Sequence, residues 1–98
     1  MERYSSRTID ELGRIVLHSE LRKKLNLSTN DKFCLKLVDT LLILQGLTNE
    51  DEESCTTCTI DGFGRIDLPG ELRKQLCWDV NDKVAVYYTD NLIILKSA

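Results

Sequence analysis

The chain has 98 residues, of which 42% are hydrophobic and 30% are charged. That balance predicts a small globular domain and excludes a disordered or fibrous chain. The formal net charge of −3 at pH 7 argues against a chain that binds nucleic acid over its whole surface. The charge is uneven, because residues 1–46 carry eight basic and six acidic residues, whereas four acidic residues stand in a row at 50–53. Nucleic-acid binding would therefore need the cations gathered on one face.

The sequence gives no sign of a membrane or secreted protein. It has no stretch of the roughly 20 apolar residues that a membrane-spanning helix needs. Its first six residues contain no apolar run like that of a signal peptide. We therefore expect a cytoplasmic protein with no membrane partner. In that compartment the four cysteines are expected to be free thiols.

The two halves of the chain repeat one another. With a shift of 51 positions, IDELGRIVL at 9–17 aligns without a gap with IDGFGRIDL at 60–68. The same shift aligns ELRK at 20–23 with ELRK at 71–74, and further matches follow to the end of each half. We conclude that the chain is an internal duplication.

Each repeat predicts the same order of elements, β-β-α-β-β. A short strand leads into a turn that contains Gly13 or Gly64, where a positive φ angle suits glycine. A second strand follows, and then a helix of about two turns that begins near Ser19 or Pro69. A polar turn and a β-hairpin close the repeat. Because the helix is too short to be stable alone and every strand has an apolar face, neither repeat is expected to fold by itself.

This order of turn glycine, arginine, apolar strand and Glu-Leu-Arg helix is shared with a known family. DELGRIVL at 10–17, followed by ELRK, resembles the N-terminal domain of AbrB-like transition-state regulators. GRIDLP at 64–69, also followed by ELRK, resembles it as well. The resemblance extends to the swapped-hairpin superfamily that includes SpoVT and the antitoxin MazE.

The resemblance implies a mostly β fold with short helices, namely a swapped-hairpin AbrB-like β-barrel. Two chains normally supply its halves, so this chain is expected to form an intrachain pseudo-dimer. The first half-domain would cover residues 1–46, an acidic linker 47–54 and the second half-domain 55–98. The two halves together would make one structural domain, and whole chains would be able to pair further into a homodimer or higher oligomer.

The resemblance also implies a bacterial transcription regulator that binds double-stranded DNA and associates with the nucleoid. The family uses basic residues of the first turn and of the strand and helix that follow. Carried over by position, the DNA-binding residues are Arg7, Arg14, Arg22 and Lys23 in the first repeat and Arg65, Arg73 and Lys74 in the second.

Three positions depart from the family pattern. Cys58 stands where the first repeat has Arg7, and His18 stands where the family has the proline found at Pro69. The glycine usual after the helix is Asn26 in the first repeat and Cys77 in the second, and asparagine accepts the left-handed conformation with less strain than cysteine. We therefore expect diverged repeats and asymmetric DNA contact.

Each candidate residue also has a purely structural interpretation. Arg14 and Arg65 are placed to form salt bridges with Asp10 and Asp61 instead of contacting DNA. The basic residues of the two helices are equally typical of a solvated helix face.

The cysteines leave metal and redox hypotheses open. Cys55 and Cys58 have the spacing of half a zinc site or of a redox pair, but on a strand they would point to opposite faces. Structural thiols are therefore the favoured interpretation, and Cys34 is expected in the core. We expect no metal and no cofactor.

No enzyme is expected either, because the sequence has no Gly-rich phosphate loop, no metalloprotease motif and no triad around His18. Two alternatives to a DNA-binding regulator remain. One is a protein-interaction module of the same fold with lost or weak DNA binding, which the acidic balance and Cys58 favour. The other is a MazE-like antitoxin. It is less favoured because that class has a toxin-wrapping tail after the last strand, and we expect no such tail in this sequence.

Overall fold

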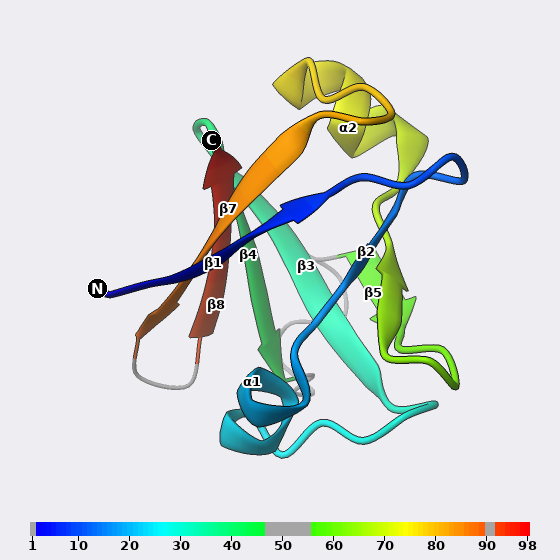
Figure 1. The fold of residues 1–98 in the computed structure, drawn as a ribbon, viewed down its shortest axis with the longest axis vertical. Helices are drawn as coiled ribbons and strands as arrows, with labels where there is room; N and C mark the ends of the chain where they lie inside the picture. The colour runs from blue at the N-terminus through cyan, green and yellow to red at the C-terminus, as the bar shows by residue number, and fades with distance from the viewer. Residues whose placement is uncertain (1, 47–55, 90–91) are drawn as a thin grey trace.

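The computed structural model describes residues 2–46, 56–89 and 92–98, so the expected acidic linker 47–54 lies outside the described residues. Each half of the chain has the β-β-α-β-β order that its sequence predicts (Figure 1). The first half comprises β1 (Glu2–Thr8), β2 (Arg14–Val16), α1 (Ser19–Lys24), β3 (Lys32–Val38) and β4 (Leu41–Gly46). The second comprises β5 (Thr56–Thr59), β6 (Arg65–Asp67), α2 (Gly70–Leu76), β7 (Lys83–Thr89) and β8 (Leu92–Ser97).

The strands of the two repeats interleave. The described strands form a six-stranded antiparallel sheet in the order β1-β7-β8-β4-β3-β5 and a two-stranded sheet of β2 and β6. β1 of the first repeat pairs with β7 of the second, and β5 of the second repeat pairs with β3 of the first. β4 and β8 join the two closing hairpins. Each repeat therefore adds its first strand to the hairpin of the other.

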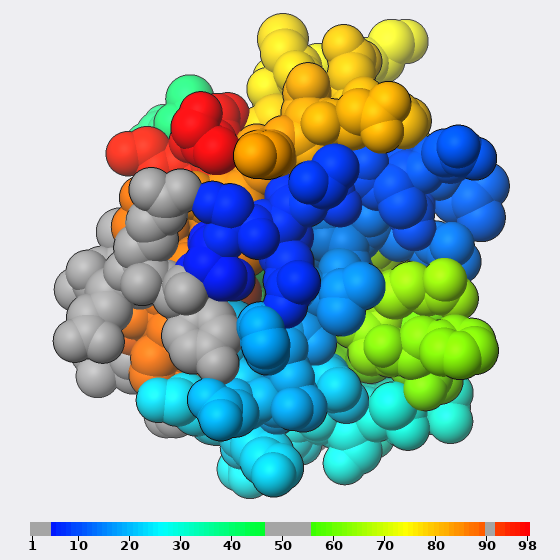
Figure 2. Space-filling view, viewed as in Figure 1, coloured from blue at the N-terminus to red at the C-terminus, as the bar shows by residue number. Residues whose placement is uncertain are grey.

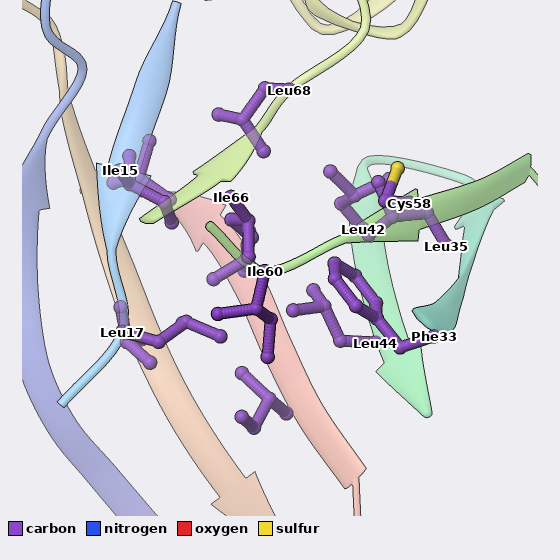
Figure 3. Packing of buried hydrophobic residues seen from close by; sticks show 14 of the residues in the cluster. Ile15, Leu17, Phe33, Leu35, Leu42, Leu44, Cys58, Ile60, Ile66 and Leu68 are labelled. Carbon is purple, nitrogen blue, oxygen red and sulfur yellow. The ribbon is translucent and has the colours of Figure 1, made fainter. Parts of the chain in front are cut away.

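Both repeats supply residues to one hydrophobic core. Figure 3 shows Ile15 and Leu17 of the first repeat converging with Ile60 and Ile66 of the second. Phe33 of β3 lies beside Leu44 in the same cluster and is completely buried. Figure 2 shows the same interlocking from outside, where blue residues of the first repeat lie directly against yellow-green residues of the second. In the described parts of the chain, no helix is long and apolar enough to cross a membrane.

The cysteines differ in one respect from the expectation of four free thiols. Cys58 and Cys77 are free, but Cys34 is buried and disulfide-bonded. The expectation was wrong for Cys34 because it rested on the expected cytoplasmic location alone and took no account of which strands pair. Pairing of β3 with β5 sets Cys34 opposite Thr57, a neighbour that is remote in sequence. The expectation that Cys34 lies in the core is confirmed.

Left-handed residues end both helical segments, at the two positions that the sequence singles out. Asn26 has φ 55° and Cys77, the C-cap of α2, has φ 58°. A left-handed conformation costs a non-glycine residue roughly 1–2 kcal/mol, and less for asparagine, whose short polar side chain tolerates it.

Substitution Cys77→Gly is therefore expected to stabilise the protein by about 1 kcal/mol, because glycine adopts this conformation without strain. The matched change Asn26→Gly should give a smaller gain. Urea unfolding followed by the fluorescence of Trp78, the single and buried tryptophan, measures both changes. Equal effects of the two substitutions, or a loss of stability in Cys77→Gly, would contradict this account.

Candidate functional site

The two-stranded sheet of β2 and β6 forms an outer face with charged side chains. Its antiparallel register pairs Arg14 with Asp67, Ile15 with Ile66, and Val16 with Arg65. Ile15 and Ile66 are buried, and side chains alternate along a strand. The side chains of the two outer pairs therefore share the opposite, solvent-facing side. The register maps onto itself when the repeats are exchanged, so the face has approximate two-fold symmetry about the Ile15–Ile66 pair.

An aspartate organises the turn before each of these strands. Asp10 Oδ1 accepts hydrogen bonds from the backbone N–H groups of Leu12 and Arg14, at 2.9 and 2.8 Å. Its Oδ2 accepts a hydrogen bond from Arg14 Nε at 2.9 Å. This is one of the two salt bridges that the sequence offered as an alternative to DNA contact.

The second repeat reproduces this turn. Asp61 Oδ1 accepts from the N–H groups of Phe63 and Arg65 at 2.8 and 2.9 Å, and Oδ2 accepts from Arg65 Nε at 2.7 Å. Hydrogen bonds from Arg65 and Phe63 lower the pKa of Asp61 to about 2, the backbone bond from Arg65 contributing most. Burial acts to raise the pKa of Asp10, but the bonds from Arg14 and Leu12 outweigh it, so that this pKa is also below its usual value.

An arginine from each helix crosses to the turn of the other repeat. The Arg73 guanidinium of α2 lies against Gly13, and the Arg22 guanidinium of α1 lies against Gly64. Backbone hydrogen bonds fix this exchange, because Leu17 N–H donates to the Gly64 carbonyl and Leu68 N–H donates to the Gly13 carbonyl, both at 2.9 Å.

The two glycines meet a double requirement. Gly13 has φ 79° and Gly64 has φ 80°, a conformation that other residues resist. A Cβ atom on Gly13 would lie 2.8 Å from the Arg73 guanidinium, and one on Gly64 would lie 3.0 Å from that of Arg22. The sequence pointed to the turn conformation, but only the fold shows that the missing side chain makes room for an arginine.

These contacts gather four arginines from both repeats, and we call this surface the arginine face: Arg14, Arg22, Arg65 and Arg73. Arg22 Nε donates to the Leu17 carbonyl at 3.2 Å, and Arg73 Nε donates to the Leu68 carbonyl at 3.0 Å. Within the described part of the chain, the hydrogen bonds of all four guanidinium groups run through Nε. Nε anchors each group, and no hydrogen bond described for these four side chains involves an Nη atom.

The other three predicted DNA-binding residues are not drawn into this face by any contact that the structure describes. Lys23 and Lys74 are exposed and each follows an arginine of the face on its helix, so it points about 100° away from that arginine. Arg7 lies on β1 opposite Val84 and is half-buried, and its Nε is buried without a hydrogen-bond partner. The structure thus brings four of the seven predicted residues together.

Sequence reasoning missed two apolar residues at the tips of the turns. Leu12 is 70% exposed and Phe63 is 78% exposed, and they occupy equivalent positions in the two repeats. The Phe63 ring centroid lies 4.8 Å from Cζ of Arg65, at cation–π distance. The signal was present in the alignment, where an apolar residue stands between the aspartate and the glycine of a solvent-facing turn in both repeats.

The cysteines do not form a described metal site. Cys55 lies outside the described residues, and among those described no three His, Cys, Asp or Glu side chains form a group suited to a metal ion. Burial, assisted by the Asp67 carboxylate, raises the pKa of Cys58 to about 11, so this thiol remains protonated at neutral pH.

Comparisons with known proteins place the fold but not the activity. No family model and no curated protein matches the chain. Its structure is similar to the solution structure of PHS018 from Pyrococcus horikoshii, with a TM-score of 0.56 and 18% sequence identity over 97% of this chain and 90% of that one. At this identity the likeness concerns the fold alone, a small and mostly β domain with short helices.

Substitution Gly64→Ala is expected to lower the free energy of unfolding by about 1–2 kcal/mol, because alanine is strained at this φ angle. It should also displace Arg22. Gly62→Ala, two residues away, faces open space and serves as the control. Urea unfolding followed by Trp78 fluorescence gives the free energy of unfolding of both variants. Similar values for Gly64→Ala and Gly62→Ala would show that position 64 has no special need for glycine.

Stability is expected to fall as the pH drops from about 4 to about 2. Because the pKa of Asp61 is lower in the folded than in the unfolded state, its carboxylate stabilises the fold above the unfolded pKa. That contribution is lost as the pH falls through the folded pKa. In Asp61→Asn, the free energy of unfolding should fall less between about pH 4 and about pH 2 than in the wild type. An equal fall in both proteins, measured by urea unfolding at each pH, would rule out this role.

Proposed function

We propose that the chain is a DNA-binding transcription regulator of the AbrB-like type, in which two repeats do the work of two subunits. The observation that carries the proposal is the arginine face. Four guanidinium groups from both repeats converge about the β2–β6 pairing, although the chain as a whole is acidic. The proposed setting is the bacterial cytoplasm, with nucleoid association when bound.

The proposed architecture is the swapped-hairpin β-barrel formed within one chain. It is supported by the exchange of first strands between the repeats and by the crossing of Arg22 and Arg73. Residues 1–46 and 55–98 would be the half-domains and 47–54 the linker that joins them.

The chemistry of the arginine face suits a nucleic-acid backbone and base edges. A guanidinium group offers planar, paired donors that match the oxygens of a phosphate or the N7 and O6 atoms of guanine. Asp10 and Asp61 hold Arg14 and Arg65 through Nε, which fixes the direction of the remaining donors before DNA arrives. The carboxylates also reduce the net positive charge, so the proposed binding depends on geometry more than on bulk attraction.

A second candidate, a protein-interaction module, is favoured by Leu12 and Phe63. Exposed apolar side chains on a charged face are common in protein interfaces. In this case the arginines would bind acidic residues of a partner protein, and duplex DNA would not compete for them.

Binding to short DNA duplexes should weaken steeply as salt rises from 50 to 200 mM, because phosphate neutralisation releases counterions. The double variant Arg14→Gln, Arg65→Gln is expected to bind at least about tenfold more weakly at low salt. Its logarithmic salt slope should fall by about 2. Fluorescence anisotropy with labelled duplexes measures both quantities.

The matched control is Lys32→Gln, Lys96→Gln, which removes two exposed cations from the six-stranded sheet and leaves the arginine face intact. Its affinity should stay within a few-fold of the wild type, and Trp78 fluorescence should report native folding for both variants. No binding of any duplex at low salt, or equal losses in the two double variants, would refute the proposed function.

A further inference from the structure

We infer that this protein reads a DNA site without two-fold symmetry and binds it in one orientation, with the end of the arginine face that carries Arg65 making the stronger contact. This inference rests on the proposed function. It goes further because it states what kind of DNA site fits and which end of the protein dominates.

The principal asymmetry lies at the centre of the face, where the repeats differ at one outward position. β2 has Val16 where β6 has Asp67. In the antiparallel register Asp67 is the cross-strand partner of Arg14, whereas Val16 is the partner of Arg65. Cross-strand partners on one face lie close enough for their side chains to interact directly. The cross-strand neighbour of Arg14 is therefore acidic, whereas that of Arg65 is apolar.

The charges at the two ends are accordingly unequal. At the Gly13 end, Arg14 and Arg73 share the face with two aspartates, Asp10, which pairs with Arg14, and Asp67, its cross-strand neighbour. At the Gly64 end, Arg65 and Arg22 are opposed by Asp61 alone. One end of the arginine face is thus balanced, and the other has a net positive charge. A DNA phosphate is attracted to the second end and meets an additional repulsion at the first.

The residues at the turn tips add a second, independent difference between the two ends, and it also favours the Arg65 end. Phe63 lies at the Arg65 end and its ring stacks near the guanidinium, whereas the equivalent residue at the other end is Leu12. An aromatic ring both orders the arginine and offers a flat surface to a base or a sugar. The charge difference and the aromatic residue favour the same end.

A palindromic site presents two identical half-sites, and only one of them would meet a matching surface here. In a site with unequal half-sites, each half-site can match the end of the arginine face that it contacts. The favoured DNA therefore has one half-site with close phosphate and base contacts and a second half-site with weaker ones.

Selection from a random duplex library tests this directly with the full-length wild-type chain. We expect an enriched site that is not palindromic. Two palindromes built from its left and right halves should each bind at least threefold more weakly than the selected site. On the selected site, Arg65→Gln should cost at least threefold more affinity than Arg14→Gln.

Substitution Asp67→Val makes the two central positions alike and provides the matched variant. It should bind DNA more tightly than the wild type and narrow the difference between the Arg14→Gln and Arg65→Gln changes. The reverse change, Val16→Asp, should weaken binding and also narrow that difference. Both residues are exposed, and Trp78 fluorescence checks that each variant is folded.

The outcomes separate this inference from the proposed function. Salt-dependent binding to a palindromic selected site, with equal losses in Arg14→Gln and Arg65→Gln, would overturn the inference and leave the DNA-binding function standing. Failure of the wild-type chain to bind any duplex at low salt would overturn both.

Discussion

The antiparallel pairing of β2 with β6 is the constraint on which the rest of the molecule depends. Each strand has only three residues and comes from a different repeat, so neither is stable without the other. Their central pair, Ile15 and Ile66, enters the shared core, and this orients the flanking side chains outward. The same pairing sets each turn glycine beside the helix of the other repeat. The interleaved core and the arginine face are therefore two consequences of a single contact between repeats.

The sequence predicted the elements because they follow from local chemistry. Turn glycines, the helix starts and the strained position of Cys77 are visible in short segments and appear twice. What it did not predict depends on pairing between repeats. The repeat alignment does not show that Arg22 lies against Gly64, the turn glycine of the other repeat. Lys23 was carried over from the family together with Arg22, but helical geometry separates the directions of the two side chains.

The aspartates at the turns order Arg14 and Arg65 and at the same time lower the net positive charge of the arginine face. A guanidinium group that is free in solution samples many rotamers and loses that freedom on binding. Asp10 and Asp61 restrict this freedom in advance, and they do so by engaging Nε and not the Nη donors. The cost is a lower net charge, which reduces indiscriminate attraction to DNA. For the proposed function, this balance favours selective recognition of DNA over indiscriminate attraction, and the additional carboxylate of Asp67 is expected to matter for it.

An NMR titration of the isotope-labelled chain with a short duplex tests the central claim most directly, because it locates the contact surface without substitutions. The account predicts saturable amide shift changes concentrated in the two turns, in β2 and β6, and around Arg22 and Arg73, and these changes should shrink as salt is added. Shift changes spread over the six-stranded sheet, or none at all at low salt, would contradict the claim that interleaving of the repeats builds a DNA-binding face.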